Sequence, residues 1–242
     1  MRKLRAHELV VLEEAAQWDM QFGSFDIRMY RWGAAEDEKI LLVHGWEGQA
    51  GNFADLIQKL LANSYQVIAF DGPSHGFSSK GKTSLFEFGS VVEAILQEHR
   101  CKKLVSHSFG GVPTTYALSR HPDIEIDRYV LLTTPDQFSQ RVDELAASVG
   151  ITEKVKRLLI ERLEAEQGID ASTLSVSNFV QTANVRKALI IHDKDDRVIS
   201  IAQSRRVCAS WKNCQIKEIE STGHFRILRT ARVLDDVVAF MN

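Results

Sequence analysis

Short apolar runs alternate with longer amphipathic stretches along most of this chain. An apolar run of about four to eight residues is typical of a buried strand, and apolar residues spaced three and four apart are typical of a helix packed on a sheet. The pattern predicts strands at residues 25–32, 39–43, 65–70, 103–106, 129–133, 188–192 and 215–220. We expect the first two to pair antiparallel across residues 33–38, within an α/β fold whose sheet is mostly parallel and covered by helices on both faces.

One segment, residues 135–185, breaks this alternation because it contains no strand pattern. Val155, Leu158, Leu159 and Leu163 recur there at helical spacing among charged residues. The segment therefore predicts a helical cap inserted into a core made of residues 1–134 and 186–242. The alternative is an ordinary surface helical hairpin, although insertions of this length are commonly lids or binding segments.

Composition predicts a single soluble domain of enzyme size. The 242 residues are 44% hydrophobic and 26% charged, which provides a large core without metals or disulfides. A formal net charge of −2 offers no basic surface for nucleic acid. Glu13 and Glu14 interrupt the apolar residues near the amino terminus, so we expect no signal peptide and no membrane span. Leu9, Leu12 and Ala16 predict an amphipathic leading helix instead.

The cysteines indicate a reducing environment. Cys101, Cys208 and Cys214 form no C-x-x-C pair and leave one thiol unpaired in any disulfide scheme. Disulfides persist mainly in oxidising compartments. We therefore predict a reduced compartment, and so reduced thiols, in a cytoplasmic protein. The expected oligomeric state is a monomer or a homodimer.

Ser108 occupies the most informative stretch of the sequence. It lies in Ser-His-Ser-Phe-Gly-Gly at residues 106–111, between a predicted strand and a run that opens a helix. A nucleophile elbow has this setting, in which a cramped turn exposes a serine hydroxyl and leaves the next backbone N–H free for an oxyanion. Ser106 stands where the usual G-x-S-x-G pattern has its first glycine. A simple strand-to-helix turn with a surface serine is the alternative interpretation.

The two partners that a serine nucleophile needs, an acid and a base, follow Ser108 in the sequence. The strand at 188–192 leads into an acidic loop with an aspartate near 196, and the strand at 215–220 leads into a glycine-containing loop with His224. The order Ser, Asp, His is the order of α/β-hydrolases. Ligand sites in such sheets lie at the carboxyl ends of strands, where all three residues are expected.

Two further turns complete a resemblance. An HG turn at residues 44–45 follows one strand and a D-x-P-x-H-G turn at residues 71–76 follows the next. With the elbow, the late acid and the late histidine, these motifs resemble the α/β-hydrolase superfamily from about residue 25 onward. The departures are Ser106 for glycine, Asp193 where a glycine commonly precedes the acid by three, and Ser200 where a proline often follows it.

The resemblance implies a role for each candidate residue. Ser108 would be the nucleophile, His224 the base and Asp196 the orienting acid, with Asp193 and Asp195 as solvated loop carboxylates or caps. The oxyanion donors would be the N–H groups of Trp46 and Phe109. The aromatic residues Trp46, Phe138 and Phe225 could line an apolar acyl pocket, and the alternative is that any of them belongs simply to the core.

No cofactor is expected. The cluster His192, Asp193, Asp195 and Asp196 could be interpreted as a metal site, but it lacks defined ligand spacing.

The sequence therefore predicts a cofactor-free serine hydrolase that cleaves a small or medium ester through an acyl-enzyme. The same triad serves lactonases, thioesterases and carbon–carbon bond hydrolases. A receptor of the same fold, with a small-molecule ligand and little turnover, is the alternative from another class. The expected partner is a small-molecule ester.

Overall fold

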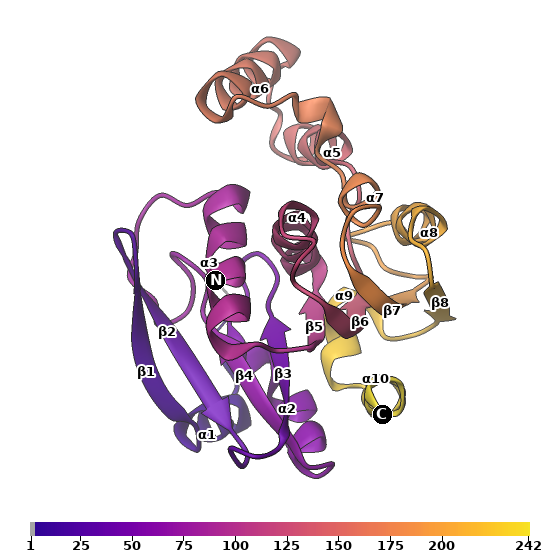
Figure 1. The fold of residues 1–242 in the computed structure, drawn as a ribbon. Helices are drawn as coiled ribbons and strands as arrows, with labels where there is room; N and C mark the ends of the chain where they lie inside the picture. Colours follow the sequence, from indigo (N-terminus) through magenta and orange to yellow (C-terminus); the bar gives the residue numbers. More distant parts are fainter. Residues whose placement is uncertain (1–2) are drawn as a thin grey trace.

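Eight strands form one twisted sheet in the computed structural model, which describes residues 3–242 (Figure 1). Their order across the sheet is β1-β2-β4-β3-β5-β6-β7-β8. Pairing is parallel from β4 through β8, and β1 and β2 pair antiparallel at one edge. The strands are β1 (Ala16–Phe22), β2 (Phe25–Trp32), β3 (Glu38–Val43), β4 (Tyr65–Phe70), β5 (Lys103–His107), β6 (Ile126–Leu132), β7 (Val185–Asp193) and β8 (Cys214–Ile219). The predicted α/β class with a mostly parallel sheet is confirmed.

The edge of the sheet differs from the expectation in two ways. The predicted pairing of β2 with β3 is wrong, because β4 lies between them and pairs antiparallel with β2, Met29 opposite Phe70. Strand β1 was not expected, and the leading helix ends before it, so Ala16 belongs to the strand. Alternate β1 side chains, Trp18 and Met20 among them, pack against one face of the sheet, as the period of a strand requires.

Helices cover both faces of the sheet. They are α1 (Ala6–Glu13), α2 (Ala54–Leu61), α3 (Leu85–His99), α4 (Gly111–Arg120), α5 (Phe138–Val149), α6 (Glu153–Gln167), α7 (Val176–Phe179), α8 (Ile201–Ser210), α9 (Gly223–Arg226) and α10 (Ala231–Met241). Four short 3-10 turns are η1 (Ala50–Phe53), η2 (Ser108–Gly110), η3 (Ala171–Thr173) and η4 (Ile227–Arg229). In β3, Ile40 and Leu42 face the cluster that includes α1, α2 and α10, whereas Leu41 and Val43 face the cluster that includes α3, α4 and α8. Strands buried on both faces explain the continuous apolar runs in the sequence.

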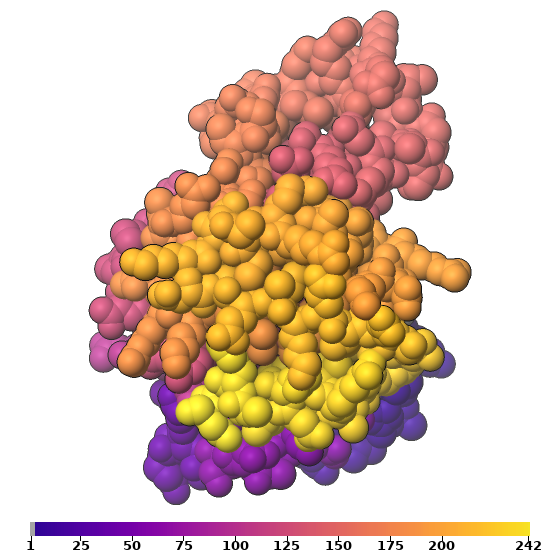
Figure 2. Space-filling model, turned by 90° about the vertical axis from the view of Figure 1, so that its right-hand side faces the viewer, coloured from indigo at the N-terminus to yellow at the C-terminus, as the bar shows by residue number. Residues whose placement is uncertain are grey.

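The segment between β6 and β7 contains α5, α6, η3 and α7. Helices α5 and α6 project from the body of the molecule, beyond the end of the sheet (Figures 1 and 2). Helix α6 buries no residue, and Leu158 and Leu159 on it are about half exposed. Phe138 and Leu163 attach the segment to a small apolar cluster around Leu85. A role as a cap stays a prediction.

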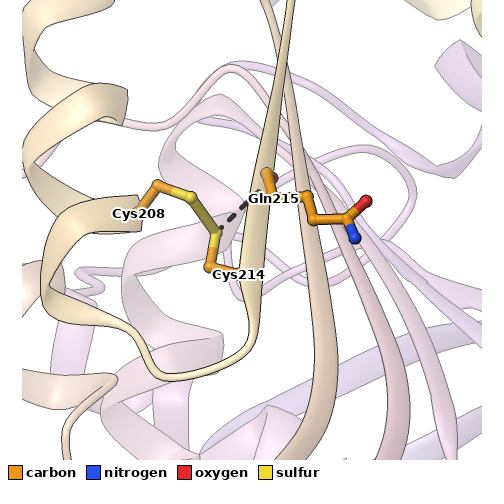
Figure 3. Close-up of a disulfide and its surroundings, with 3 residues drawn as sticks. All are labelled: Cys208, Cys214 and Gln215. Carbon is orange, nitrogen blue, oxygen red and sulfur yellow. Dashed lines mark hydrogen bonds between the residues drawn. A yellow bond between two sulfur atoms is a disulfide. The ribbon is translucent and has the colours of Figure 1, made fainter.

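The prediction of reduced cysteines is wrong for two of the three. Cys208 at the end of α8 and Cys214 at the start of β8 form a disulfide, with their Cα atoms 5.4 Å apart (Figure 3). The intervening loop is short enough to bring the two together. Cys101 is free and buried. Within residues 3–242, no helix has the length and apolar character needed to cross a membrane.

Candidate active site

Ser108 lies on a sharp turn between β5 and α4. Its φ of 55° is in the left-handed region, which is strained for a residue with a side chain and is typical of functional turns. Its backbone N–H donates to the Thr133 carbonyl at the end of β6, 2.8 Å away, which holds the turn against the sheet. The predicted strand-to-helix elbow is therefore formed at the carboxyl edge of the strands.

Close backbone packing around the elbow explains its small residues. A Cβ atom on Gly110 would lie 2.5 Å from the carbonyl oxygens of Val43 and His44, so no larger residue fits beside the HG turn. Ser106, which replaces the usual first glycine, is fully buried, and its hydroxyl lies 2.9 Å from that of Tyr129. Its one polar atom is thus satisfied inside the core.

The structure brings together the three residues that the sequence placed in separate loops. The Ser108 hydroxyl lies 2.9 Å from Nε2 of His224, and Nδ1 of His224 lies 2.8 Å from Oδ2 of Asp196. The other oxygen of Asp196 accepts the backbone N–H groups of Val198 and Ile199. Asp195, the competing candidate for the acid, is exposed to solvent.

Electrostatics favour the ionised form of Asp196. Burial by itself raises the pKa of a carboxyl group, but hydrogen bonding and attraction from His224, with the two backbone donors, lower the pKa of Asp196 below its usual value. An ionised carboxylate can only accept, so the proton of a neutral His224 sits on Nδ1. Nε2 then has a free lone pair directed at the Ser108 hydroxyl, which is the arrangement of a general base.

Asp193 has a place that the sequence did not predict. Of the two roles expected for Asp193, a solvated carboxylate or a cap, the first is wrong, because its side chain has no exposed surface. Oδ2 accepts the hydroxyl and the N–H of Thr222 and the N–H of Gly223, and Oδ1 accepts the N–H of Asp195 at 2.7 Å. Although burial raises its pKa, these hydrogen bonds outweigh that effect and lower it. The carboxylate ties the acid loop to the two residues that precede His224.

Two buried histidines brace the same loops. His192 lies between Ser204 Oγ, 2.6 Å from Nδ1, and the carbonyl of Ile199, 3.0 Å from Nε2. Burial lowers its pKa and favours the neutral ring. Nε2 of His107 lies 2.9 Å from the backbone carbonyl of His224. Each ring therefore holds a backbone carbonyl close to His224 and Asp196.

His44 organises the HG turn. Its Nδ1 lies 2.8 Å from the carbonyl of Gly45, and its Nε2 accepts the N–H of Gly72 at 2.8 Å. Only a neutral ring protonated at Nδ1 satisfies both bonds. Complete burial, with a smaller effect from His75, lowers the pKa of His44 to about 3. The turn after β3 is thereby fixed beside the elbow, where Trp46 packs edge-on against Phe109 with ring centroids 5.1 Å apart.

A cavity of about 230 Å³ opens beside Ser108 and His224. Its apolar lining includes Trp46, Phe53 and Phe225, so two of the three predicted pocket residues lie at this cavity. Phe138 is not among the lining residues and packs in the apolar cluster below α5 and α6.

No metal site accompanies the triad in the part of the chain that the structure describes. Within residues 3–242, no three His, Cys, Asp or Glu residues are grouped so that they could hold a metal ion.

Comparison with known proteins agrees with this geometry. A family model described as the alpha/beta hydrolase fold matches residues 39–150. The structure superposes on a bacterial membrane phospholipase A with a TM-score of 0.76 at 17% identity, over 96% of this chain and 88% of the other. The chain has the α/β-hydrolase fold.

Two curated proteins show what the sequence is similar to. A serine hydrolase-like protein from Danio rerio is 26% identical over 152 residues, covering 59% of this chain and 45% of the relative. A pimeloyl-[acyl-carrier protein] methyl ester esterase from Xanthomonas campestris is 35% identical over 85 residues, covering 35% of this chain and 33% of the relative. The chain thus spans less than half the length of these two relatives.

Proposed function

We propose that this protein is a serine hydrolase that cleaves a small ester through an acyl-enzyme on Ser108. The observation that carries the proposal is the continuous chain of hydrogen bonds from the Ser108 hydroxyl through His224 to Asp196, 2.9 Å and 2.8 Å long. A serine hydroxyl is a weak nucleophile until a neutral imidazole removes its proton as it attacks. The curated esterase relative supports an ester as the substrate.

In the proposed reaction, the Ser108 oxygen bonds to the ester carbonyl carbon while its proton passes to Nε2 of His224. Asp196 stabilises the imidazolium that forms. The carbonyl oxygen becomes an oxyanion, for which we assign the backbone N–H groups of Trp46 and Phe109 as donors. Collapse of this intermediate breaks the bond to the alcohol oxygen, which takes the proton from His224.

The acyl-enzyme is then resolved by water. His224 accepts a proton from the water as its oxygen attacks the acyl carbon, and returns that proton to Ser108 as the acid leaves. The cavity beside Ser108, at about 230 Å³, is below the usual range for drug-sized ligands, which supports a small acyl group. Trp46 and Phe225 would contact its apolar part.

Steady-state hydrolysis of p-nitrophenyl esters of increasing acyl length tests this function. A hydrolase turns over many times per site, prefers one acyl length, and loses this activity on Ser108→Ala. Median enzymes run at roughly 10 s⁻¹, and an unnatural ester can be much slower. A single burst without further cycles, or tight binding of an intact ester, would support the receptor alternative and contradict the proposal.

A further inference from the structure

The segment around the start of α1 forms one wall of the cavity at Ser108. Lys3, Arg5 and Glu8 line it, and Arg229 at the end of η4 lines it from another side. No residue of α5 or α6 is among the lining residues of this cavity. The lysine and arginine side chains at this cavity thus come from the segment that leads into α1 and from η4.

Packing fixes this wall in place. Leu4 is buried and lies with Leu12 over Gly51, so closely that a Cβ on Gly51 would be 2.9 Å from the Leu4 side chain. The indole N–H of Trp32 donates to the carbonyl of Val11 at 2.8 Å and holds the helix to the sheet. Lys3 therefore extends from an anchored backbone.

Some charged side chains at the cavity form ion pairs within the protein, and others do not. Arg5 is neutralised by Glu8 at 2.8 Å and Asp55 at 3.5 Å. Lys3 and Arg229 are both exposed, and neither makes an ion pair with any residue in the range 3–242. Two cations thus remain available to a ligand that enters the cavity.

One anionic residue opposes them. Glu47 also lines the cavity, is exposed, and makes no ion pair with the rest of the described chain. The unpaired charges at the cavity are thus two positive and one negative, which favours an anionic ligand. A guanidinium matches the two oxygens of a carboxylate in a bidentate pair, and an ammonium adds a point charge.

Resting on the proposed hydrolase function, we propose that Lys3 and Arg229 select short esters whose acyl chain ends in a carboxylate. The cavity volume of about 230 Å³ equals roughly eight times the volume of a water molecule in the liquid. A cavity of this volume suits a short half-ester of a dicarboxylic acid. Its ester carbon would lie at Ser108, its methylene groups beside Trp46 and Phe225, and its free carboxylate beside the cations.

The test compares monomethyl glutarate with methyl 5-methylhexanoate, in which an isopropyl group replaces the carboxylate. The ratio of kcat/KM for the anionic ester to that for the neutral ester is measured for the wild type, Lys3→Gln and Arg229→Gln. Each exposed ion pair contributes up to about a fivefold effect, so we expect each variant to lower the ratio by two- to fivefold, mainly through KM. Glu47→Gln should raise the ratio, because it removes the opposing charge.

Lys154→Gln is the matched control, since Lys154 is exposed on α6 and does not line the cavity. Its ratio should equal that of the wild type. Equal ratios in all variants, with the neutral ester still hydrolysed, would overturn the selectivity alone. If the wild type hydrolyses neither these esters nor p-nitrophenyl esters, the proposed function fails and this inference fails with it.

Discussion

Asp193→Asn tests how the loop of His224 is held. In the wild type, one carboxylate oxygen accepts three hydrogen bonds from Thr222 and Gly223, and the other accepts the N–H of Asp195. An asparagine offers a single acceptor oxygen. If that oxygen faces Thr222, the amide NH₂ meets the Asp195 N–H, and that N–H is left without its acceptor in the loop.

The size of the effect follows from these four bonds. A hydrogen bond to a charged group contributes about 1.5–3 kcal/mol, and the three that remain become neutral and weaker. Because such losses are not additive, we expect about 3 kcal/mol of lost stability, which corresponds to a fall in Tm of roughly 6–12 °C for a chain of this size. A displaced His224 should also lower kcat, since a shift of about 1 Å at a catalytic group can cost on the order of 100-fold.

The assay is thermal unfolding followed by ester hydrolysis at a temperature where the variant is folded. Asp195→Asn is the control, because Asp195 is exposed and contributes only its backbone N–H to Asp193. That variant should stay within about 0.5 kcal/mol of the wild type. A wild-type Tm and a wild-type kcat for Asp193→Asn would refute the idea that this carboxylate positions the histidine loop.

Two other predictions concern the turn after β3. The pKa of His44 is about 3 when folded and 6.5 as a model value, so below pH 6.5 the unfolded chain binds a proton that the folded chain does not. The free energy of unfolding must then fall as pH falls, by about 2–3 kcal/mol between pH 6.5 and 4.5. Denaturant titrations of His44→Gln should show a smaller fall over the same range. An equal fall in this variant would contradict His44 as the cause. Gly110→Ala should lower the free energy of unfolding by about 1–3 kcal/mol, because its Cβ would collide with the carbonyl of Val43. Thermal unfolding measures this loss, and a wild-type Tm for the variant would contradict the close packing at Gly110.

The sequence was sufficient to predict the centre of the sheet and the edge of the sheet where Ser108, Asp196 and His224 lie. Continuous apolar runs place β3 to β7, and the carboxyl ends of parallel strands meet at one edge, so residues far apart in sequence come together there. Ser108 and His224 are at this edge for that reason. The resemblance to the α/β-hydrolase pattern selected Asp196 from its neighbours, and in the structure Asp196 is the aspartate that lies 2.8 Å from His224. Its role as the orienting acid stays a prediction.

Features that depend on packing between residues far apart in the sequence could not be predicted from local sequence patterns. The burial of Asp193 depends on the approach of Thr222 from another loop, and no local pattern signals it. Cys208 and Cys214 pair because α8 turns directly into β8, whereas counting cysteines gives no pairing. Strand β1 carried the one missed signal, since Trp18 and Met20 alternate with polar residues at the period of a strand.

The most direct test of the central claim is the rate at which an organophosphonate reacts with Ser108, followed by mass spectrometry of the intact protein and of its peptides. We expect one adduct per chain, located on Ser108 and absent from Ser108→Ala. Because His224 and Asp196 act as a unit with the serine, His224→Ala and Asp196→Asn should each slow the reaction by on the order of 10³-fold or more. An adduct at another residue, or wild-type rates in the His224 variant, would contradict the claim that this serine is an activated nucleophile.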